Sequence, residues 1–263
     1  METERSLLLG SVRNAARVLR AFTGAGQEFG VSELARHLGL SKSTTHRLLA
    51  TLAHARLLEQ DQHTGRYRLG LALYELGSSV TQHVDLHEAA LPVLTSLRHT
   101  TGEMVHVAVL DGLEVVYVER LESHHMLPVF RQVGHRLPAH QTASGKVLLA
   151  ALPREQLLAR LQGVVLARRT ERTITEHERL LCDLDVVTRR GWAMNAEEGH
   201  TGVVSVGAPL RGPDGRVIAA VSIVGATQRM QPAMQRHTTL LIESARVISR
   251  RLGYRPTIAP LPR

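Results

Sequence analysis

Apolar side chains recur at helical spacing in two short neighbouring segments, within residues 31–58. The first segment carries a narrow apolar stripe: Leu34, Ala35 and Leu38. The second buries residues spaced i, i+3, i+4 and i+7: Thr45, Leu48, Leu49 and Leu52. Ser32 is the expected N-cap of the first helix, Gly39 suits a left-handed residue after it, and Ser41 suits the next N-cap. The pattern therefore predicts two helices joined by a tight turn.

The same helical period places small, polar and basic side chains on the opposite face of the second helix: Lys42, Ser43, His46 and Arg47. Such a face at a helix N-terminus suits the major groove of DNA. Lys42 and Arg47 are expected mainly at phosphates, and Ser43, Thr44 and His46 closest to base edges. An ordinary helical hairpin with a solvated outer face is the alternative interpretation.

A β-hairpin is predicted immediately after the second helix, with strands at 57–60 and 66–69 around a turn that ends at Gly65. Arg66 and Arg68 alternate with Tyr67 and Leu69, so one face can pack while the other meets phosphate. A helix-turn-helix followed by a basic hairpin is a winged helix, which favours DNA binding over a plain helical hairpin.

The segments on either side complete this first domain. Residues 11–22 predict an amphipathic helix with one apolar side: Val12, Ala15, Ala16, Leu19 and Phe22. Residues 70–86 read as a helix interrupted at 77–79, which suits a linker that supports a dimer. The expected organisation is a winged helix-turn-helix DNA-binding domain at 8–70, a linker helix at 71–86 and a second domain at 87–263.

From residue 87 onward, helical and strand-like patterns alternate. Helices are expected at 87–100, 142–152, from 153, at 175–190 and at 232–252. Strands are expected at 103–110, 113–120, 126–130, 192–196, 203–210 and 216–224. Asp111 and Gly112 form a two-residue hairpin turn between the first two strands. The pattern predicts an α+β domain, an antiparallel sheet with its helices gathered on one side.

Composition agrees with this organisation and indicates which classes of partner to expect. The 263 residues suffice for two domains, and the formal charge of +8 suggests a polyanionic partner. Residues 34–58 contain basic side chains and no carboxylate, so positive charge is local to the helix pair. There is no apolar run of membrane-spanning length and no signal-peptide pattern, so no membrane is expected. The single cysteine, Cys182, fits a reducing cytoplasm and is expected to be a small core residue.

Motifs for catalysis or metal binding are scarce. Gly145 and Lys146 lack the remaining residues of a phosphate-binding loop, and Ser144 lacks the frame of a nucleophile elbow. The 15 histidines show no metal-ligand spacing. Glu197 and Glu198 could form an acid/base pair, but a solvated pair or a cap is the preferred interpretation. No catalytic residue, metal or cofactor is therefore expected.

Several short motifs, in this order and spacing, carry a family resemblance that runs from about residue 11 to 253. They are Gly39 to Leu49 (GLSKSTTHRLL), Gly65 to Gly70 (GRYRLG), Val133 to Pro138 (VGHRLP), Thr142 to Lys146 (TASGK), Glu197 to Gly202 (EEGHTG), and Ala208-Pro209. The chain resembles the IclR family of bacterial transcriptional regulators. The resemblance implies a winged helix followed by a GAF-like effector domain, assembled as dimers or dimers of dimers.

The resemblance also implies operator binding that responds to a small metabolite, often a carboxylate or an aromatic compound. Carried over by position, the family's pocket falls on Met126, Val129, Ala143, Ser144, Asn195, Val203, Ser205, Ser222 and Val224. The apolar members would form walls, the polar members would anchor polar groups, and the helix start at 143–145 would favour an anion. Ser205 stands where the family often has a cysteine, so effector chemistry does not transfer directly. Ordinary alternation along a strand would equally explain Val203, Ser205 and Ser222.

The function predicted is a DNA-binding transcriptional regulator that acts as a homodimer or tetramer on a pseudo-palindromic operator. A single recognition helix reads only a few base pairs, and two-fold pairing doubles that readout. A ligand-independent architectural DNA binder is one alternative. An enzyme with a winged-helix interaction module is another, disfavoured by the missing catalytic residues.

Overall fold

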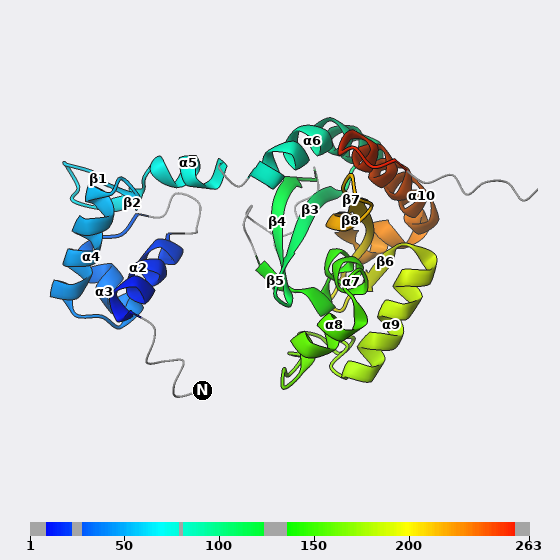
Figure 1. Ribbon diagram of the computed structural model, residues 1–263, viewed down its shortest axis with the longest axis horizontal. Coiled ribbons are helices and arrows are strands. Elements are labelled where there is room, and N and C mark those ends of the chain that lie inside the picture. Colours follow the sequence, from blue (N-terminus) through cyan, green and yellow to red (C-terminus); the bar gives the residue numbers. More distant parts are fainter. Residues whose placement is uncertain (1–8, 23–27, 79–80, 124–135, 256–263) are drawn as a thin grey trace, which may run out of the picture. The chain divides into compact units, whose positions relative to one another are not determined.

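The computed structural model describes residues 9–22, 28–78, 81–123 and 136–255. The chain divides into two compact units, Met1–Thr81 and Gln82–Arg263, and each is described separately (Figure 1). Among the described helices, none combines the length and apolar character needed to cross a lipid bilayer.

The first unit is a winged helix, as predicted. It contains α2 (Gly10–Ala21), α3 (Val31–Leu38), α4 (Lys42–His54), the antiparallel strands β1 (Leu58–Gln60) and β2 (Tyr67–Leu69), and α5 (Ala72–Ser78). Its core gathers apolar side chains from the first three helices and both strands: Val18, Phe22, Leu34, Leu49, Leu52, Leu58 and Tyr67.

The turn between α3 and α4 has the predicted chemistry. Gly39 is left-handed (φ 66°), and the Ser41 hydroxyl accepts a hydrogen bond from the Thr44 N–H at 3.1 Å. The predicted cap of α3 is wrong, because Gly30 rather than Ser32 precedes the helix. Phe29 forms a backbone bridge with β2, and this extended pairing lets α3 begin directly at residue 31.

The predicted apolar side of α2 is wrong in part. Val12 is 62% exposed and Ala16 is also exposed, whereas Val18 is fully buried. Arg17 Nη2 donates to the carbonyl of Leu38 at 2.6 Å, which ties α2 to the end of α3 in this orientation. Two overlapping apolar stripes run along α2, and periodicity alone could not decide which faces the core.

The second unit is built on a six-stranded antiparallel sheet with strand order β5-β4-β3-β8-β7-β6. The strands are β3 (Met104–Asp111), β4 (Glu114–Leu121), β5 (Arg136–Pro138), β6 (Ala193–Ala196), β7 (Val203–Arg211) and β8 (Val217–Ala226). The helices are α6 (Thr81–Thr101), η1 (Ala139–Gln141), α7 (Ala143–Ala150), α8 (Arg154–Leu161), α9 (His177–Arg190) and α10 (Thr227–Arg251). The α+β class and the GAF-like arrangement are as predicted.

Helices cover both faces of this sheet, which corrects the expectation that they gather on one side (Figure 1). Alternate residues of β3 illustrate the reason. Val105 and Val107 pack with α6 and α10, while Ala108 packs with α7, α8 and α9. Because successive strand residues point to opposite faces and both sets are apolar, each face needs its own helical layer.

Several element boundaries differ from the sequence-based expectation. α10 starts five residues before the expected Pro232, which therefore lies inside the helix near its beginning. Strand β5 was not expected, because its residues show no clear alternation of apolar and polar side chains. The expected strand at 126–130, with Met126 and Val129, lies outside the described residues.

Cys182 is exposed, so the prediction of a core cysteine is wrong. The buried face of α9 is formed by Leu180, Leu184 and Val187, at spacings of four and three residues. Residue 182 lies about 200° around the helix from residue 180 and so falls outside that stripe.

Candidate functional site

The start of α4 presents an exposed polar surface. The five side chains expected at DNA on this helix are all exposed: Lys42, Ser43, Thr44, His46 and Arg47. Thr45, in their midst, is fully buried, and its hydroxyl donates to the Ser41 carbonyl at 3.0 Å. The helix is thus anchored by its inner face while its first turns remain open to a large partner.

The two arginines of the hairpin are held by carboxylates. Arg66 Nη2 lies 2.9 Å from Glu33 Oε2 and donates to the Glu28 carbonyl, and Arg68 Nη2 lies 3.1 Å from Glu59 Oε2. Exposed ion pairs of this kind contribute about 0–1 kcal/mol, so a phosphate can compete for the guanidinium groups. Tyr67 is buried, but Leu69 is 41% exposed and does not pack as expected.

In the second unit, a small cavity of about 20 Å³ lies beside the start of α7. Four of the expected effector residues line it: Asn195, Val203, Ser205 and Val224. The other lining residues are Tyr117, Leu137, Gln141, Thr142, Arg169, Gly199 and His200. This volume holds roughly one water molecule, so a larger ligand requires neighbouring side chains to move.

The first turn of α7 is packed directly on the sheet. The Thr142 hydroxyl caps the helix by accepting from the Gly145 N–H at 2.9 Å. A Cβ atom on Gly207 of β7 would lie 2.8 Å from the Ala143 carbonyl carbon and 3.0 Å from the Ser144 nitrogen. Only glycine at 207 allows this approach, which brings Ala143 and Ser144 beside the cavity without lining it.

Buried hydroxyl groups near the cavity have no hydrogen-bond partner within the described part of the chain. They are Ser144 Oγ and Ser222 Oγ, and both residues are only 1% exposed. The amide oxygen Oε1 of Gln141 is likewise buried without a hydrogen-bond partner among the described residues. An unpartnered buried polar atom costs about 1–3 kcal/mol. Polar groups of a bound ligand would remove that cost.

A buried ion cluster links α7 to the loop that carries Gly199 and His200. Lys146, 1% exposed, has its Nζ 2.6 Å from Glu198 Oε2 and 2.8 Å from Asp183 Oδ2. Burial raises the pKa of Glu198, Asp183 raises it further, and Lys146 opposes both. The Thr227 hydroxyl donates to Glu197 at 2.8 Å. Both glutamates are therefore committed to structural contacts, which argues against an acid/base pair.

An imidazole packs at a tilt against a phenol ring that lines the cavity. The rings of His106 and Tyr117 have centroids 4.6 Å apart. Burial, together with the charge of Arg120, lowers the pKa of His106 to about 3, so the imidazole is neutral at physiological pH. Burial raises the pKa of Tyr117, partly opposed by a hydrogen bond with Thr142.

Sequence reasoning missed part of this cavity. Alternation along β4 could have indicated that Tyr117 points to the same face as Val115. Arg169 and His200 lie in irregular segments without a periodic signal, and only the fold brings them to the cavity.

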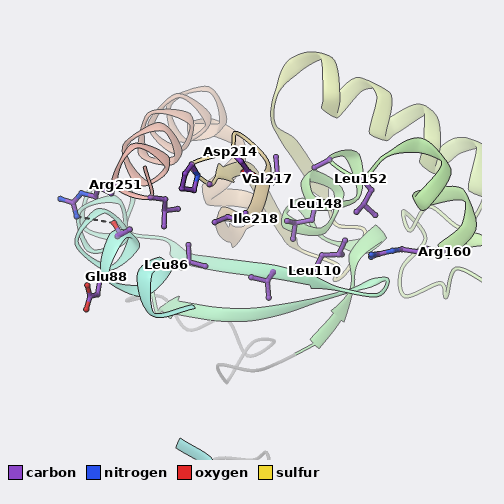
Figure 2. Close-up of a pocket in the computed structure, with 16 residues that line it drawn as sticks. Leu86, Glu88, Leu110, Leu148, Leu152, Arg160, Asp214, Val217, Ile218 and Arg251 are labelled. Carbon is purple, nitrogen blue, oxygen red and sulfur yellow. Dashed lines mark hydrogen bonds between the residues drawn. The ribbon is translucent and has the colours of Figure 1, made fainter. Parts of the chain in front are cut away.

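A larger groove, about 1100 Å³, lies at the other end of α7 (Figure 2). Leu86, Leu110, Leu152 and Ile218 contribute much of its apolar wall, and Arg160 and Arg251 lie at its margins. None of its lining side chains belongs to the buried unpartnered polar groups found among the described residues. The small cavity therefore carries the stronger chemical signature of a ligand site despite its size.

Comparison with known protein families matches both units. Residues 11–62 match the IclR helix-turn-helix domain, and residues 78–250 match the domain described as bacterial transcriptional regulator IclR C-terminal.

Individual relatives span nearly the whole chain. The HTH-type transcriptional regulators XynR and KdgR of Escherichia coli (strain K12) are each 36% identical, covering 94% of this chain and 98% and 94% of their own lengths. A solved IclR homolog from Microbacterium hydrocarbonoxydans, complexed with 4-hydroxybenzoate, superposes with a TM-score of 0.82 at 29% identity. That likeness covers 92% of this chain and 99% of the homolog.

Proposed function

The chain belongs to the IclR family of bacterial transcriptional regulators, and from this premise we propose that α4 reads an operator while the α7 cavity binds a small effector. As a member, it is a transcriptional regulator with an N-terminal helix-turn-helix domain and a C-terminal effector domain. The individual DNA contacts, the effector class and the assembly are the proposed part.

Exposure and charge support the DNA contacts. Lys42 and Arg47 project from the open first turns of α4, and neither has an ion-pair partner in the described residues. Each can therefore neutralise a phosphate without first breaking a contact. Ser43, Thr44 and His46 share that exposed surface, where short polar side chains can approach base edges. Arg66 and Arg68 are proposed as further phosphate contacts after exchange of their carboxylate partners.

The hydroxyls of Ser144 and Ser222, which have no hydrogen-bond partner among the described residues, are the single observation that carries the effector site. They lie beside the N-terminus of α7, where backbone N–H groups favour an anion. A relative binds 4-hydroxybenzoate, which combines a carboxylate with an aromatic ring. We therefore assign the effector to small carboxylates, with Asn195 and Ser205 as further polar anchors, and with Val203 and Val224 as apolar walls. Met126 and Val129 remain proposed walls by resemblance alone.

Exposed apolar side chains support a dimer. Around α5, Leu71 is 67% exposed, Tyr74 75% and Leu76 60%. Three large apolar side chains on one short segment favour contact with a second copy over contact with water. A dimer places two α4 helices on a pseudo-palindromic operator, with half-sites about one helical turn apart or a multiple of that.

The test is an operator-binding titration on the DNA upstream of the gene and its neighbours, with and without small carboxylates. Arg47→Ala should weaken binding to every sequence and lower the salt slope by about one unit. Ser222→Ala and Asn195→Ala should reduce the effector response while keeping effector-free affinity, and Thr239→Ala, on the exposed side of α10, is the matched control. Unchanged effector titrations in both pocket variants would place the effector elsewhere, and binding that ignores every carboxylate would favour the architectural binder.

A further inference from the structure

One row of the sheet leads from the proposed effector site to a buried arginine. His106 of β3 pairs with Ser222 of β8 on one side and with Arg120 of β4 on the other. Directly paired residues of an antiparallel sheet point to the same face. Ser222 shares its face with Val224, which lines the cavity. The face that carries the cavity therefore also carries Arg120.

The Arg120 guanidinium is buried and only partly compensated. Its side chain is 6% exposed, and Nε and Nη1 have no hydrogen-bond partner in the described residues. Among the described residues, its one ion-pair contact joins Nη2 to Glu122 at 3.3 Å, and the Glu122 side chain is 72% exposed. Burial lowers the pKa of Arg120, but a guanidinium remains protonated at neutral pH. Three buried N–H groups, one on Nε and two on Nη1, thus have no acceptor in the part of the chain that the structure describes.

Other buried charged side chains in the same unit are paired with groups of opposite charge. Lys146 meets two carboxylates, and Glu103, 3% exposed, accepts two hydrogen bonds from Arg229 at 2.6 and 3.0 Å. Burying a charge without a partner is costly, and an unsatisfied buried group in a native protein calls for an explanation, of which a bound ion is one. The incomplete pairing of Arg120 therefore points to an anion that this structure does not contain.

The described residues that flank Arg120 in its row of the sheet do not supply that anion. His106 is neutral, and its ring packs on Tyr117. Ser222, beyond His106, contributes only a hydroxyl. Neighbouring strands lie about 4.8 Å apart, so the Ser222 and Arg120 backbones, two strands apart, are separated by about 10 Å. The two polar positions are too far apart for one carboxylate and close enough for one small molecule.

We propose that Arg120 is a second anchor of the effector site, and that the effector is a small anion with an acidic group at each end. One acidic group binds Ser144, Ser222 and the N-terminus of α7, and the other binds Arg120. The intervening part of the molecule crosses His106 and Tyr117. This inference rests on the proposed effector site and specifies the charge and length of its ligand.

The experiment measures binding of matched acids to the full-length protein by isothermal titration calorimetry. The probes are the dicarboxylates succinate, adipate and suberate, each beside its monocarboxylate of equal length: butyrate, hexanoate and octanoate. The aromatic pair is terephthalate and benzoate. We expect at least one dicarboxylate to bind about tenfold more tightly than its partner, the worth of one charge-assisted contact.

Arg120→Gln should reduce that preference to within about twofold while leaving monocarboxylate binding unchanged. Arg120→Lys, which keeps the charge, should retain part of the preference. Arg216→Gln is the matched control, because Arg216 is 86% exposed and should leave every titration unchanged. The ligand-free melting temperature of Arg120→Gln should equal or exceed that of the wild type, since Nε and Nη1 have no acceptor among the described residues without a ligand.

The inference would be overturned by equal binding of each acid pair to the wild type or by a preference that survives in Arg120→Gln. A clear drop in ligand-free melting temperature, which marks a structural arginine, would also overturn it. Absence of binding by every dicarboxylate would overturn it as well. Failure of the proposed function is distinguishable, because it appears as unchanged effector titrations in Ser222→Ala and Asn195→Ala. A normal response to monocarboxylates with no role for Arg120 would leave the pocket in place and remove only the second anchor.

Discussion

Two helices of this regulator, α4 and α7, have the same capping chemistry at their N-termini, but one N-terminus is exposed and the other is buried. In α4, the Ser41 hydroxyl accepts from the N–H three residues later, and in α7 the Thr142 hydroxyl does the same. Both starts carry a lysine, a serine and small residues. The start of α4 is exposed, whereas every residue from Ala143 to Leu149 is buried. Local sequence creates in both cases a helix end that favours anions. By our proposal, burial then decides whether that anion is a DNA phosphate or a small effector.

The two lysines show what that selection does. Lys42 is exposed and keeps its charge available for a partner. Lys146 is already matched by Glu198 and Asp183, so its charge holds the structure together and is not available to a ligand. At α7, the groups that we propose for effector recognition are therefore hydroxyls, backbone N–H groups and Arg120.

The largest expected effect is a loss of stability when the charge of the buried lysine, Lys146, is removed. Lys146→Met should lower the free energy of unfolding by about 3–5 kcal/mol, because two carboxylates lose their cation in a buried site. Lys42→Met, at an exposed position, should change it by less than about 0.5 kcal/mol. Chemical denaturation followed by circular dichroism measures both. Comparable losses in the two variants would mean that burial does not distinguish the two lysines.

A double variant tests whether the stability loss in Lys146→Met comes from the lost charge. Lys146→Met combined with Glu198→Gln should recover part of the loss, because one uncompensated carboxylate is removed with the ammonium. If the two losses simply add, the lysine stem and its packing, rather than the ion pair, hold the loop to α7.

The next effect concerns pH and the buried ring beneath the cavity. The folded-state pKa of His106, about 3, lies below its ordinary 6.5, so the stability that it contributes is present above pH 6.5 and is lost as pH falls toward 3. At a pH of about 4.5 this loss amounts to about 2–3 kcal/mol. In His106→Gln, the free energy of unfolding should fall less between neutral and mildly acidic pH. A parallel pH profile in wild type and variant would contradict the buried neutral imidazole.

A smaller effect belongs to the exposed helix. Lys42→Met should weaken operator binding about tenfold and reduce the salt slope by about one unit, as expected for one lost phosphate contact. Fluorescence anisotropy at several salt concentrations measures both quantities. A loss confined to one operator sequence would instead assign Lys42 to a base.

The smallest effect compares the two caps directly. Ser41→Ala and Thr142→Ala should each cost about 1 kcal/mol of unfolding free energy, the usual value of a capping hydroxyl. Only Ser41→Ala should also weaken operator binding, and only Thr142→Ala should alter the response to carboxylates. Thermal unfolding and the two binding assays provide the readouts, and a variant that affects both assays would indicate coupling through the linker.

Sequence patterns predicted the winged helix closely, because its elements follow one another along the chain. The left-handed Gly39, the Ser41 cap and the exposed face of α4 all follow from residues within one or two turns. The side of α2 that faces the core depends on a contact between Arg17 and Leu38, which are distant in sequence. Periodicity contains no information about such a contact.

For the effector domain, the fold class was predictable from the sequence, but the residues of the candidate site were only partly so. The hairpin turn at 111–112 and the alternating strands indicated an antiparallel sheet, and resemblance indicated Asn195, Val203, Ser205 and Val224 at the cavity. The partners of Lys146 come from two other elements, and Arg120 shares a sheet face with the cavity only through strand register. A pairing between strands is a property of the folded sheet, and no local pattern specifies it.

The exposed position of Cys182 on α9 has a practical consequence. Because the chain contains a single cysteine, one thiol-reactive dye or nitroxide can label each molecule at one defined place without any substitution. The neighbouring Asp183 contacts Lys146, so the label reports from the helix that holds the start of α7. In an assembly of identical chains, paired labels would turn this residue into a spectroscopic ruler for subunit rearrangement.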